Sequence, residues 1–224
     1  MKLFFILFVL IGVMLAAYPF FDASNKNKKL IDLPWQIEIT EAGSTRVFGL
    51  HLGHSTLAEA VTHLGSDMSL AIVAANDEAG SLEMYYGHFR SGLLSGKLVI
   101  TADVDTQSVK AWRNNAVRQE YMATGKAKKY FLSEKDLPRA MDTVISGLTF
   151  IPNVNLDEAL VVARFGKPDQ RLADEAETHL LYPEKGLQVS LYEHAKEVLQ
   201  YVPPADFSVL RQSLVNEFDD MSAK

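Results

Sequence analysis

The sequence contains no cysteine among its 224 residues, and this absence excludes several kinds of chemistry. Without a thiol, the chain forms no disulfide, offers no thiolate ligand to a metal and has no cysteine nucleophile. It also lacks the cysteine to which a bacterial lipoprotein attaches its lipid. A chain without thiols is indifferent to redox conditions, so the composition does not fix its compartment.

An excess of basic residues is absent as well. The formal net charge is -6, from 22 lysines and arginines and 28 aspartates and glutamates. Four of the lysines and one aspartate belong to the N-terminal stretch, which leaves 18 basic and 27 acidic residues in the body of the chain. Because so acidic a body repels phosphate backbones, we expect no nucleic-acid partner.

One long uncharged run is present, and no second run of this kind follows it. Leu3–Phe21 comprises 19 residues without a charge. As a helix it measures about 28 Å, close to the hydrocarbon thickness of a bilayer. A cleaved signal peptide needs small residues before the cut, but Leu15 and Phe21 occupy the third-last positions before the two candidate cuts. The run therefore favours an uncleaved anchor over a signal peptide.

The charges that flank this run bear on its orientation. Lys2 and the terminal amine favour a cytoplasmic N-terminus, whereas the lysines at 26, 28 and 29 favour the opposite. We expect the export-type arrangement: residues 1–23 as transmembrane anchor or signal segment, residues 24–34 as tether, and the body in the periplasm. The chain is then a single-pass protein of the cell inner membrane. The alternative is secretion to the periplasm after signal cleavage.

Residues 35–104 combine strand and helix patterns and predict a first α+β module. Apolar side chains occupy every second position in Trp35–Thr40 and in Arg46–Gly53, which predicts a hairpin. Ser55–Gly65 has hydroxyl residues at its start, helical spacing of apolar side chains and a terminal glycine, so it predicts a short helix. Further strands are expected at 69–75, 81–89 and 96–104.

Residues 105–147 change to a helical period and are interpreted as a helical connector. Residues 148–206 then predict a second α+β module. Its helix begins near Asn155 and ends at Gly166, and its strands are expected at 178–182, 187–192 and 198–202. Residues 207–224 form a weakly helical C-terminal tail whose last residues should fray.

The predicted fold class is therefore α+β: an N-terminal membrane helix, then two small helix-plus-antiparallel-sheet modules joined by a helical segment. The element order is the same after "STLAEAVTHLG" and after "NLDEALVVARFGKP". An internal repeat and a shared layout without common ancestry both explain this order. A shift of 106 residues places four residues of the first module on identical residues of the second: Glu78 on Glu184, Gly80 on Gly186, Tyr86 on Tyr192 and His88 on His194.

The second module contains "LDEALVVARFGKPD", "PEKGLQVSLY" and "EVLQYV". This layout of helix, Gly-x-Pro and three strands, over residues 155–202, resembles the small outer-membrane-assembly lipoproteins of the SmpA/OmlA type. The chain departs from them in lacking the lipid-bearing cysteine, with a membrane span in its place. The resemblance implies a binding or scaffolding role in the cell envelope and implies no catalytic residue.

Motifs for chemistry are few. The stretch Ser91–Leu98 resembles a phosphate-binding loop but lacks its first glycine and its final hydroxyl residue, and no G-x-S-x-G motif occurs. We therefore expect no enzyme and no cofactor. The alternative is a metal-dependent hydrolase, because three histidines and a carboxylate lie close in the sequence and suit zinc. These residues are His51, His54, Glu59 and His63.

Aromatic residues on the predicted strands are the better candidates for a functional surface. Some of them would face outward if one face of each sheet packs on helices. Alternation places Met84 and Tyr86 on one face and Tyr85 on the other. We expect a ligand or partner surface formed by Tyr85, Phe89 and Tyr192, with no metal. The predicted function is a non-enzymatic envelope protein that binds an unknown envelope protein, a peptide or an apolar ligand.

Overall fold

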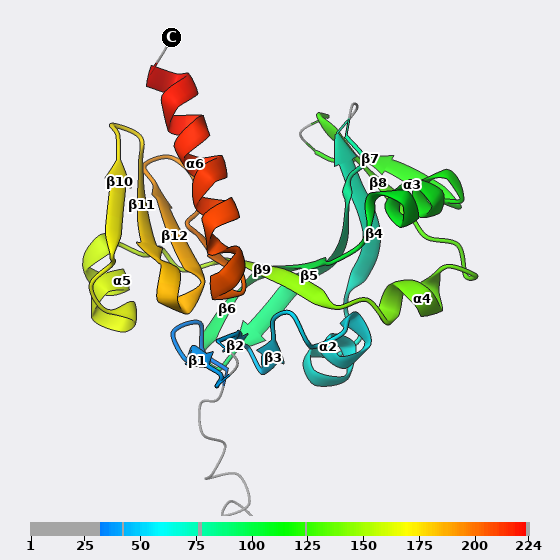
Figure 1. Cartoon of the computed structure of the whole chain (residues 1–224), viewed down its shortest axis with the longest axis horizontal. Helices are drawn as coiled ribbons and strands as arrows, with labels where there is room; N and C mark the ends of the chain where they lie inside the picture. Colours follow the sequence, from blue (N-terminus) through cyan, green and yellow to red (C-terminus); the bar gives the residue numbers. More distant parts are fainter. Residues whose placement is uncertain (1–31, 42, 76–77, 124, 223–224) are drawn as a thin grey trace, which may run out of the picture. The chain divides into compact units, whose positions relative to one another are not determined.

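The computed structural model describes residues 32–41, 43–75, 78–123 and 125–222, with the side chains of the last helix described as far as Asn216. Asp32–Lys224 form one unit, which is described here by itself (Figure 1). The predicted anchor and most of the tether lie outside the described residues. Within the described part of the chain, no helix is long and apolar enough to cross a bilayer.

The described unit contains five α-helices, two short 3-10 helices and two antiparallel sheets. The helices are α2 (Leu57–Leu64), α3 (Thr106–Asn114), α4 (Leu137–Met141), α5 (Glu158–Phe165), α6 (Phe207–Ser222), η1 (Pro183–Lys185) and η2 (Pro204–Asp206). A small sheet consists of β1 (Glu38–Ile39), β2 (Thr45–Val47) and β3 (Leu50–His51). The large sheet consists of β4 (Ser69–Ala75), β5 (Ser81–Ser91), β6 (Leu94–Ala102), β7 (Arg118–Tyr121), β8 (Ala127–Phe131), β9 (Ile145–Pro152), β10 (Gln170–Ala173), β11 (Glu177–Tyr182), β12 (Leu187–Tyr192) and β13 (Val198–Tyr201).

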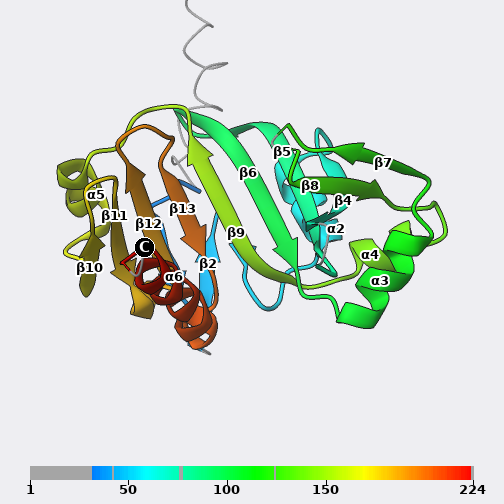
Figure 2. The ribbon, with the colours of Figure 1, turned by 90° about the horizontal axis from the view of Figure 1, so that it is seen from above.

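The mixed α+β class is confirmed, but the two expected sheets are one. The large sheet has the order β10-β11-β12-β13-β9-β6-β5-β4-β8-β7, and all of its pairs are antiparallel (Figure 2). The halves join where β9 pairs with β13. An unpaired strand edge exposes a row of backbone donors and acceptors, so joining two such edges satisfies both.

The expected helical connector, residues 105–147, is also different in the structure. Its first half contains helix α3, but residues 118–131 contain the hairpin β7–β8, and β8 extends the large sheet beside β4. Its end belongs to β9, which begins at Ile145. The pairing with β4 outweighs the local helical period, because sheet hydrogen bonds and packing override weak helix preference.

The two faces of the large sheet have different roles, and we name them the core face and the outer face. The core face packs against the helices α2, α3 and α5 and the small sheet, and it carries the buried side chains Leu82, Met84, Leu98, Ile100, Phe150, Leu187, Val189 and Tyr201. The outer face carries the alternate positions of the same strands, which include Tyr85, Val99, Thr149 and Gln200. Helix α6 lies on the outer face (Figure 1).

The strand pairings show that the two halves of the sheet are laid out alike about the β9–β13 pair. In one half Tyr85 pairs with Val99 and Val99 with Thr149. In the other half Leu181 pairs with Gln188 and Gln188 with Gln200. Thr149 and Gln200 pair with each other at the centre. Each element of the N-terminal half (α2, β4, β5, β6 and β9) therefore has an equivalent in the C-terminal half (α5, β10, β11, β12 and β13).

The loops that follow the two helices obey the same equivalence. Gly65 ends α2 with φ 98° and ψ 173°, and Gly166 ends α5 with φ 88° and ψ -178°. This backbone conformation is essentially restricted to glycine. The hydroxyl of Tyr86 donates to the Gly65 carbonyl at 2.9 Å, and the hydroxyl of Tyr182 donates to the Gly166 carbonyl at 3.0 Å. Each half thus ties its helix to its second long strand in the same way.

This geometry corrects the shift of 106 residues. The shift placed Tyr86 on Tyr192, whereas the pairings and the glycine contacts make Tyr86 equivalent to Tyr182. No single shift relates the halves, because the turns between strands differ in length. The helices and β4 are offset from their equivalents by 101 residues, and the later strands by less.

Candidate functional site

Helix α6 covers the outer face in the C-terminal half only. Leu181, Phe207 and Leu214 form a buried cluster between this helix and strand β11. Leu172, Val202 and Leu210 pack around the cluster. The apolar positions of α6 follow the helical spacing i, i+3, i+7, so one stripe of the helix is fixed on the sheet.

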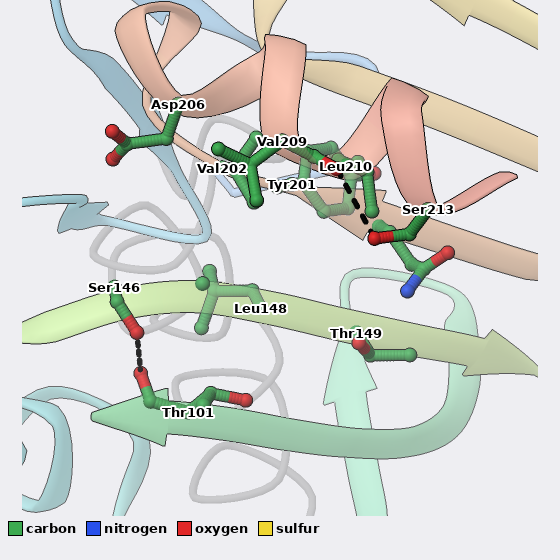
Figure 3. A pocket seen from close by; sticks show the side chains of 12 residues that line it. Thr101, Ser146, Leu148, Thr149, Tyr201, Val202, Asp206, Val209, Leu210 and Ser213 are labelled. Carbon is green, nitrogen blue, oxygen red and sulfur yellow. Dashed lines mark hydrogen bonds between the residues drawn. The ribbon is translucent and has the colours of Figure 1, made fainter. Parts of the chain in front are cut away.

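A first pocket, of about 430 Å³, lies where the cover of α6 ends. Val209, Leu210 and Ser213 line it from the helix, and Thr101 and Thr149 line it from strands β6 and β9 (Figure 3). The Ser146 hydroxyl donates to the Thr101 carbonyl at 3.2 Å on its sheet side. Because Leu210 and Val202 both line this pocket and pack in the α6 interface, the pocket continues that interface.

A second pocket, of about 450 Å³, lies on the outer face of the N-terminal half. Residues of five neighbouring strands, β9, β6, β5, β4 and β8, line this pocket. They include Ala71, Val73, Tyr85, Val99, Lys129 and Ile151. Residues 120–123, at the end of β7, form another part of its lining.

The two pockets are neighbours on one face, and we call them together the trough. Tyr85 pairs with Val99 and Val99 with Thr149, which in turn pairs with Gln200. Tyr85 and Val99 line the second pocket, and Thr149 and Gln200 line the first. From β4 to β13 the trough spans four strand spacings, or about 19 Å. Each pocket falls within the volume range of known ligand sites, about 300–1,000 Å³.

Large apolar side chains stand in solvent on both sides of the trough. Val209 on α6 is 69% exposed and lines the first pocket, and Tyr121 on β7 is 70% exposed and lines the second. Water contact with such side chains is unfavourable by about 25 cal/mol for each Å² of apolar surface. Apolar residues gathered around a hollow are typical of a surface that binds something.

Charges of both signs surround the apolar floor. The Lys129 ammonium lies 5.1 Å from the centre of the Tyr85 ring, and Lys97, Glu83 and Glu120 also line the second pocket. Burial raises the pKa of the Glu83 carboxyl above its ordinary value, against the smaller opposing effects of the Ser81 hydroxyl and of Lys129. Because burial disfavours the charged form of the Glu83 carboxyl, this group favours a ligand that is neutral or that donates a hydrogen bond.

Of the three aromatic residues predicted as a surface, Tyr85 lies in the trough. Tyr86 is buried and Tyr85 is half-buried on the outer face, as the alternation predicts. Tyr192 also lies on the outer face, but in the C-terminal half, where its ring meets His179 edge to face at 6.1 Å. The strands of Tyr85 and Tyr192 are four spacings apart, so the two residues do not form one site.

The prediction for Phe89 is wrong. The register of β5 against β6 shifts between Tyr86 and Phe89, where β5 has one residue more than its partner. This bulge reverses the alternation, so Phe89 points to the core face. It is only 6% exposed and packs against Phe48 and Phe150.

The four residues of the alternative metal site do not converge. His51 and His54 stack with ring centres 4.2 Å apart, whereas Glu59 takes part in the capping box of α2 with Thr56. His63 lies 3.3 Å from Asp32. Burial, followed by the nearby charges of His54 and Arg46, lowers the pKa of His51. Among the described residues, no group of three or more histidines and carboxylates is placed to hold a metal ion.

A buried polar network lies on the outer face of the C-terminal half. Nδ1 of His179 is 2.8 Å from the Ser190 hydroxyl oxygen, and Nε2 of His179 is 3.2 Å from a Glu177 carboxylate oxygen. The Gln188 amide also reaches the Ser190 oxygen, at 3.1 Å. The order carboxylate, imidazole, hydroxyl resembles a catalytic relay. However, Ser190 is 1% exposed in the middle of a strand, so a substrate carbonyl has no approach to it, and we interpret the network as structural.

Most residues of the trough were not predicted as site residues. Ile151 and Thr149 alternate with the buried Leu148 and Phe150, a period of two that was not recognised as strand β9. Lys97 and Val99 alternate in the same way within β6, which was predicted. Their common site depends on pairing between strands far apart in the sequence, and no local pattern carries that information.

No family model matches this chain, and neither a curated protein nor a solved structure matches it.

Proposed function

We propose that this chain is a non-enzymatic, membrane-tethered protein of the cell envelope that binds a partner molecule in the trough. The observation that carries the proposal is the asymmetry of the outer face. Its C-terminal half is covered by α6, and its N-terminal half leaves an apolar floor open between two walls that each carry an exposed apolar side chain.

The chemistry of the trough suits recognition. The floor supplies apolar contact through Val99 and Ile151, and the rim supplies charges through Lys129 and Glu120. An apolar centre with a few polar groups at its edge is the usual composition of a binding site. The resemblance of residues 155–202 to envelope assembly lipoproteins agrees with a binding or scaffolding role.

The location is part of the same proposal. Residues 1–23 anchor the chain in the inner membrane, and the body faces the periplasm. Fractionation of cells, followed by protease treatment of spheroplasts, tests this part: the body should remain with the membranes and be digested from outside. A body that resists the protease until the membrane is dissolved would contradict it.

The binding role is tested by photocrosslinking in living cells. A photoreactive residue at Val99 in the floor should form a specific crosslinked product. The same residue at Leu160 is the matched control, because Leu160 is 38% exposed on α5 and lines neither pocket. A product from Val99 but not from Leu160 supports a partner in the trough. The absence of a product from Val99, or equal products from both positions, would contradict the proposal.

A further inference from the structure

The equivalence of the two halves identifies the residues of the open half that correspond to the sheet contacts of α6. Helix α6 packs on Leu172, Leu181 and Val202. Leu181 is equivalent to Tyr85. Leu181 pairs with Gln188 and Tyr85 pairs with Val99, and these partners pair in turn with the central residues Gln200 and Thr149. From this pair, the pairing of β10 with β11 and of β4 with β5 makes Leu172 equivalent to Ala71.

The third contact follows from the centre of the sheet. Thr149 pairs with Gln200. Ile151 comes two residues after Thr149 in β9, and Val202 comes two residues after Gln200, directly after the end of β13. Val202 is bound to Gly186 by a backbone hydrogen bond of 2.8 Å, as Ile151 is paired with Lys97. Ile151 is therefore the equivalent of Val202.

All three equivalents, Ala71, Tyr85 and Ile151, line the second pocket. The pocket thus occupies the place that corresponds to α6 in the other half. Its floor is apolar at the same three positions, with Ala71, which is 3% exposed, in place of Leu172, an aromatic ring in place of Leu181 and an isoleucine in place of Val202. The first pocket connects it to the α6 interface through Val202 and Leu210.

We infer that the second pocket binds an amphipathic helix of a partner polypeptide, and this inference rests on the proposed function. The partner helix carries apolar side chains at i, i+3 and i+7, the spacing of Phe207, Leu210 and Leu214 in α6. It lies on Ala71, Tyr85 and Ile151 as α6 lies on their equivalents. Recognition of a helix by an apolar groove is a recurring mode of peptide binding, with anchors at this spacing.

Within the described part of the chain, neither α6 nor α5 of a second copy is available to supply the helix. Leu214 is 4% exposed and Phe207 is 3% exposed, so α6 of each copy is already occupied with its own strands. Helix α5 lies on the core face, where Val161 and Phe165 are buried. We therefore assign the helix to another polypeptide.

The probe for this inference is a synthetic fluorescent peptide with the sequence of residues 204–222, which contains α6. The full chain in lipid nanodiscs is titrated with this peptide and the fluorescence anisotropy is recorded. The matched control peptide carries aspartate in place of Leu210 and Leu214. We expect saturable binding of the first peptide and at least about tenfold weaker binding of the second.

Variants of the chain then place the bound peptide. Ile151→Asp should weaken binding about tenfold or more, and Leu160→Asp on α5 should leave it unchanged. Because Ile151 is half-buried, Tyr85→Ala provides a second, milder variant, and the unfolding transition of each variant is recorded. Binding that is lost in Ile151→Asp and reduced in Tyr85→Ala supports the inference.

No saturable binding of the peptide, or binding that Ile151→Asp and Tyr85→Ala leave unchanged, would overturn the inference. Displacement of the chain's own α6 by the peptide would also overturn it, and greater accessibility of Leu181 to solvent would reveal this. A specific crosslink from Val99 together with no peptide binding would retain the proposed function and reject the helix. Failure of the crosslink itself would reject both.

Discussion

The two halves of the large sheet share a layout and differ in what covers them. In the C-terminal half, Leu181 on β11 is fully buried beneath α6. In the N-terminal half, the equivalent Tyr85 on β5 lines an open pocket. The core face is filled in both halves, and both tie a tyrosine to the glycine that ends a helix. The difference is confined to the outer face, so we propose that the open half of that face binds a partner and that its covered half and the core face stabilise the fold.

The chemistry beneath each surface agrees with this division. The covered half holds a buried network in which His179 and the Gln188 amide nitrogen both contact the Ser190 hydroxyl. The positions equivalent to His179 and Ser190 in the open half are Glu83 and Thr101, and both line the trough. Buried polar groups must find partners within the protein, whereas those of an open site remain available to a ligand.

The largest expected effect comes from truncating the equivalent side chains of the two halves. Leu181→Ala should lower the free energy of unfolding by about 2–5 kcal/mol, because it leaves a cavity beneath α6. Tyr85→Ala should lower it by about 1 kcal/mol or less, because the ring is half-exposed and covered by no helix. Urea unfolding monitored by circular dichroism measures both. Equal losses would show that the outer face of the N-terminal half is also part of the stabilising core.

The glycines that end α2 and α5 provide a test of the shared layout. Gly65→Ala and Gly166→Ala should each cost about 1–3 kcal/mol, because both positions have positive φ with extended ψ. An added Cβ meets no atom within 4 Å at Gly65 and only the Lys185 side chain, at 3.8 Å, at Gly166, so the cost is conformational. Urea unfolding of the two variants should give similar losses. A large loss at one position and none at the other would break the equivalence.

A smaller effect is expected from the tyrosine hydroxyls. Tyr86→Phe and Tyr182→Phe each remove one hydrogen bond to a glycine carbonyl and should each cost about 1 kcal/mol. Burial raises the pKa of both phenols to about 12, with Glu158 and Asp169 adding to the effect at Tyr182. Tyr121→Phe is the control, since its side chain is 70% exposed, and it should leave the midpoint of unfolding unchanged. Losses of stability no larger than in Tyr121→Phe would show that the two tyrosine hydrogen bonds do not stabilise the fold.

The smallest effect concerns Glu83 in the open half. A carboxyl whose pKa is raised in the folded protein destabilises the fold at pH values above its ordinary pKa of 4.5. At lower pH both folded and unfolded states are protonated, so this cost disappears. Glu83→Gln should therefore raise the melting temperature at pH 7, and this effect should shrink as the pH falls from the raised pKa of the folded state towards 4.5 and be absent below it. A stabilisation that is the same at both ends of this range would show that ionisation of Glu83 is not its cause.

The elements that sequence patterns predicted correctly are those with strong local signals. Helices α2 and α5 follow from a capping residue, a stripe of apolar side chains and a terminal glycine, and both occur where they were expected. Strand β12 was predicted with its true ends. The segment "LQVSLY" has alternating apolar residues, and it is bounded by a turn before it and a charged loop after it. In these segments local preference and tertiary environment agree.

The elements that were missed depend on partners far away in the sequence. Strand β7 is the end of a segment, residues 105–122, whose apolar residues have helical spacing. Its pairing with β8, through the turn at Gly125 with φ of 70°, makes it a strand. Strand β9 pairs with β6 on one side and with β13 on the other, about 50 residues away in each direction. The trough consists of side chains that these distant pairings bring together, and it was therefore beyond a reading of local patterns.

The absence of cysteine makes the central claim directly measurable. Tyr85→Cys introduces a single thiol into the open half, and Leu160→Cys introduces one on the other side of the sheet as a control for access of the reagent. We expect the purified protein to react with the thiol reagent at both positions. In intact cells the ratio of the labelling rate at position 85 to that at position 160 should be at least about tenfold lower than in the purified protein, because a partner covers position 85. An unchanged ratio of the two labelling rates between purified protein and cells would contradict the claim that the open half of the sheet is a binding surface.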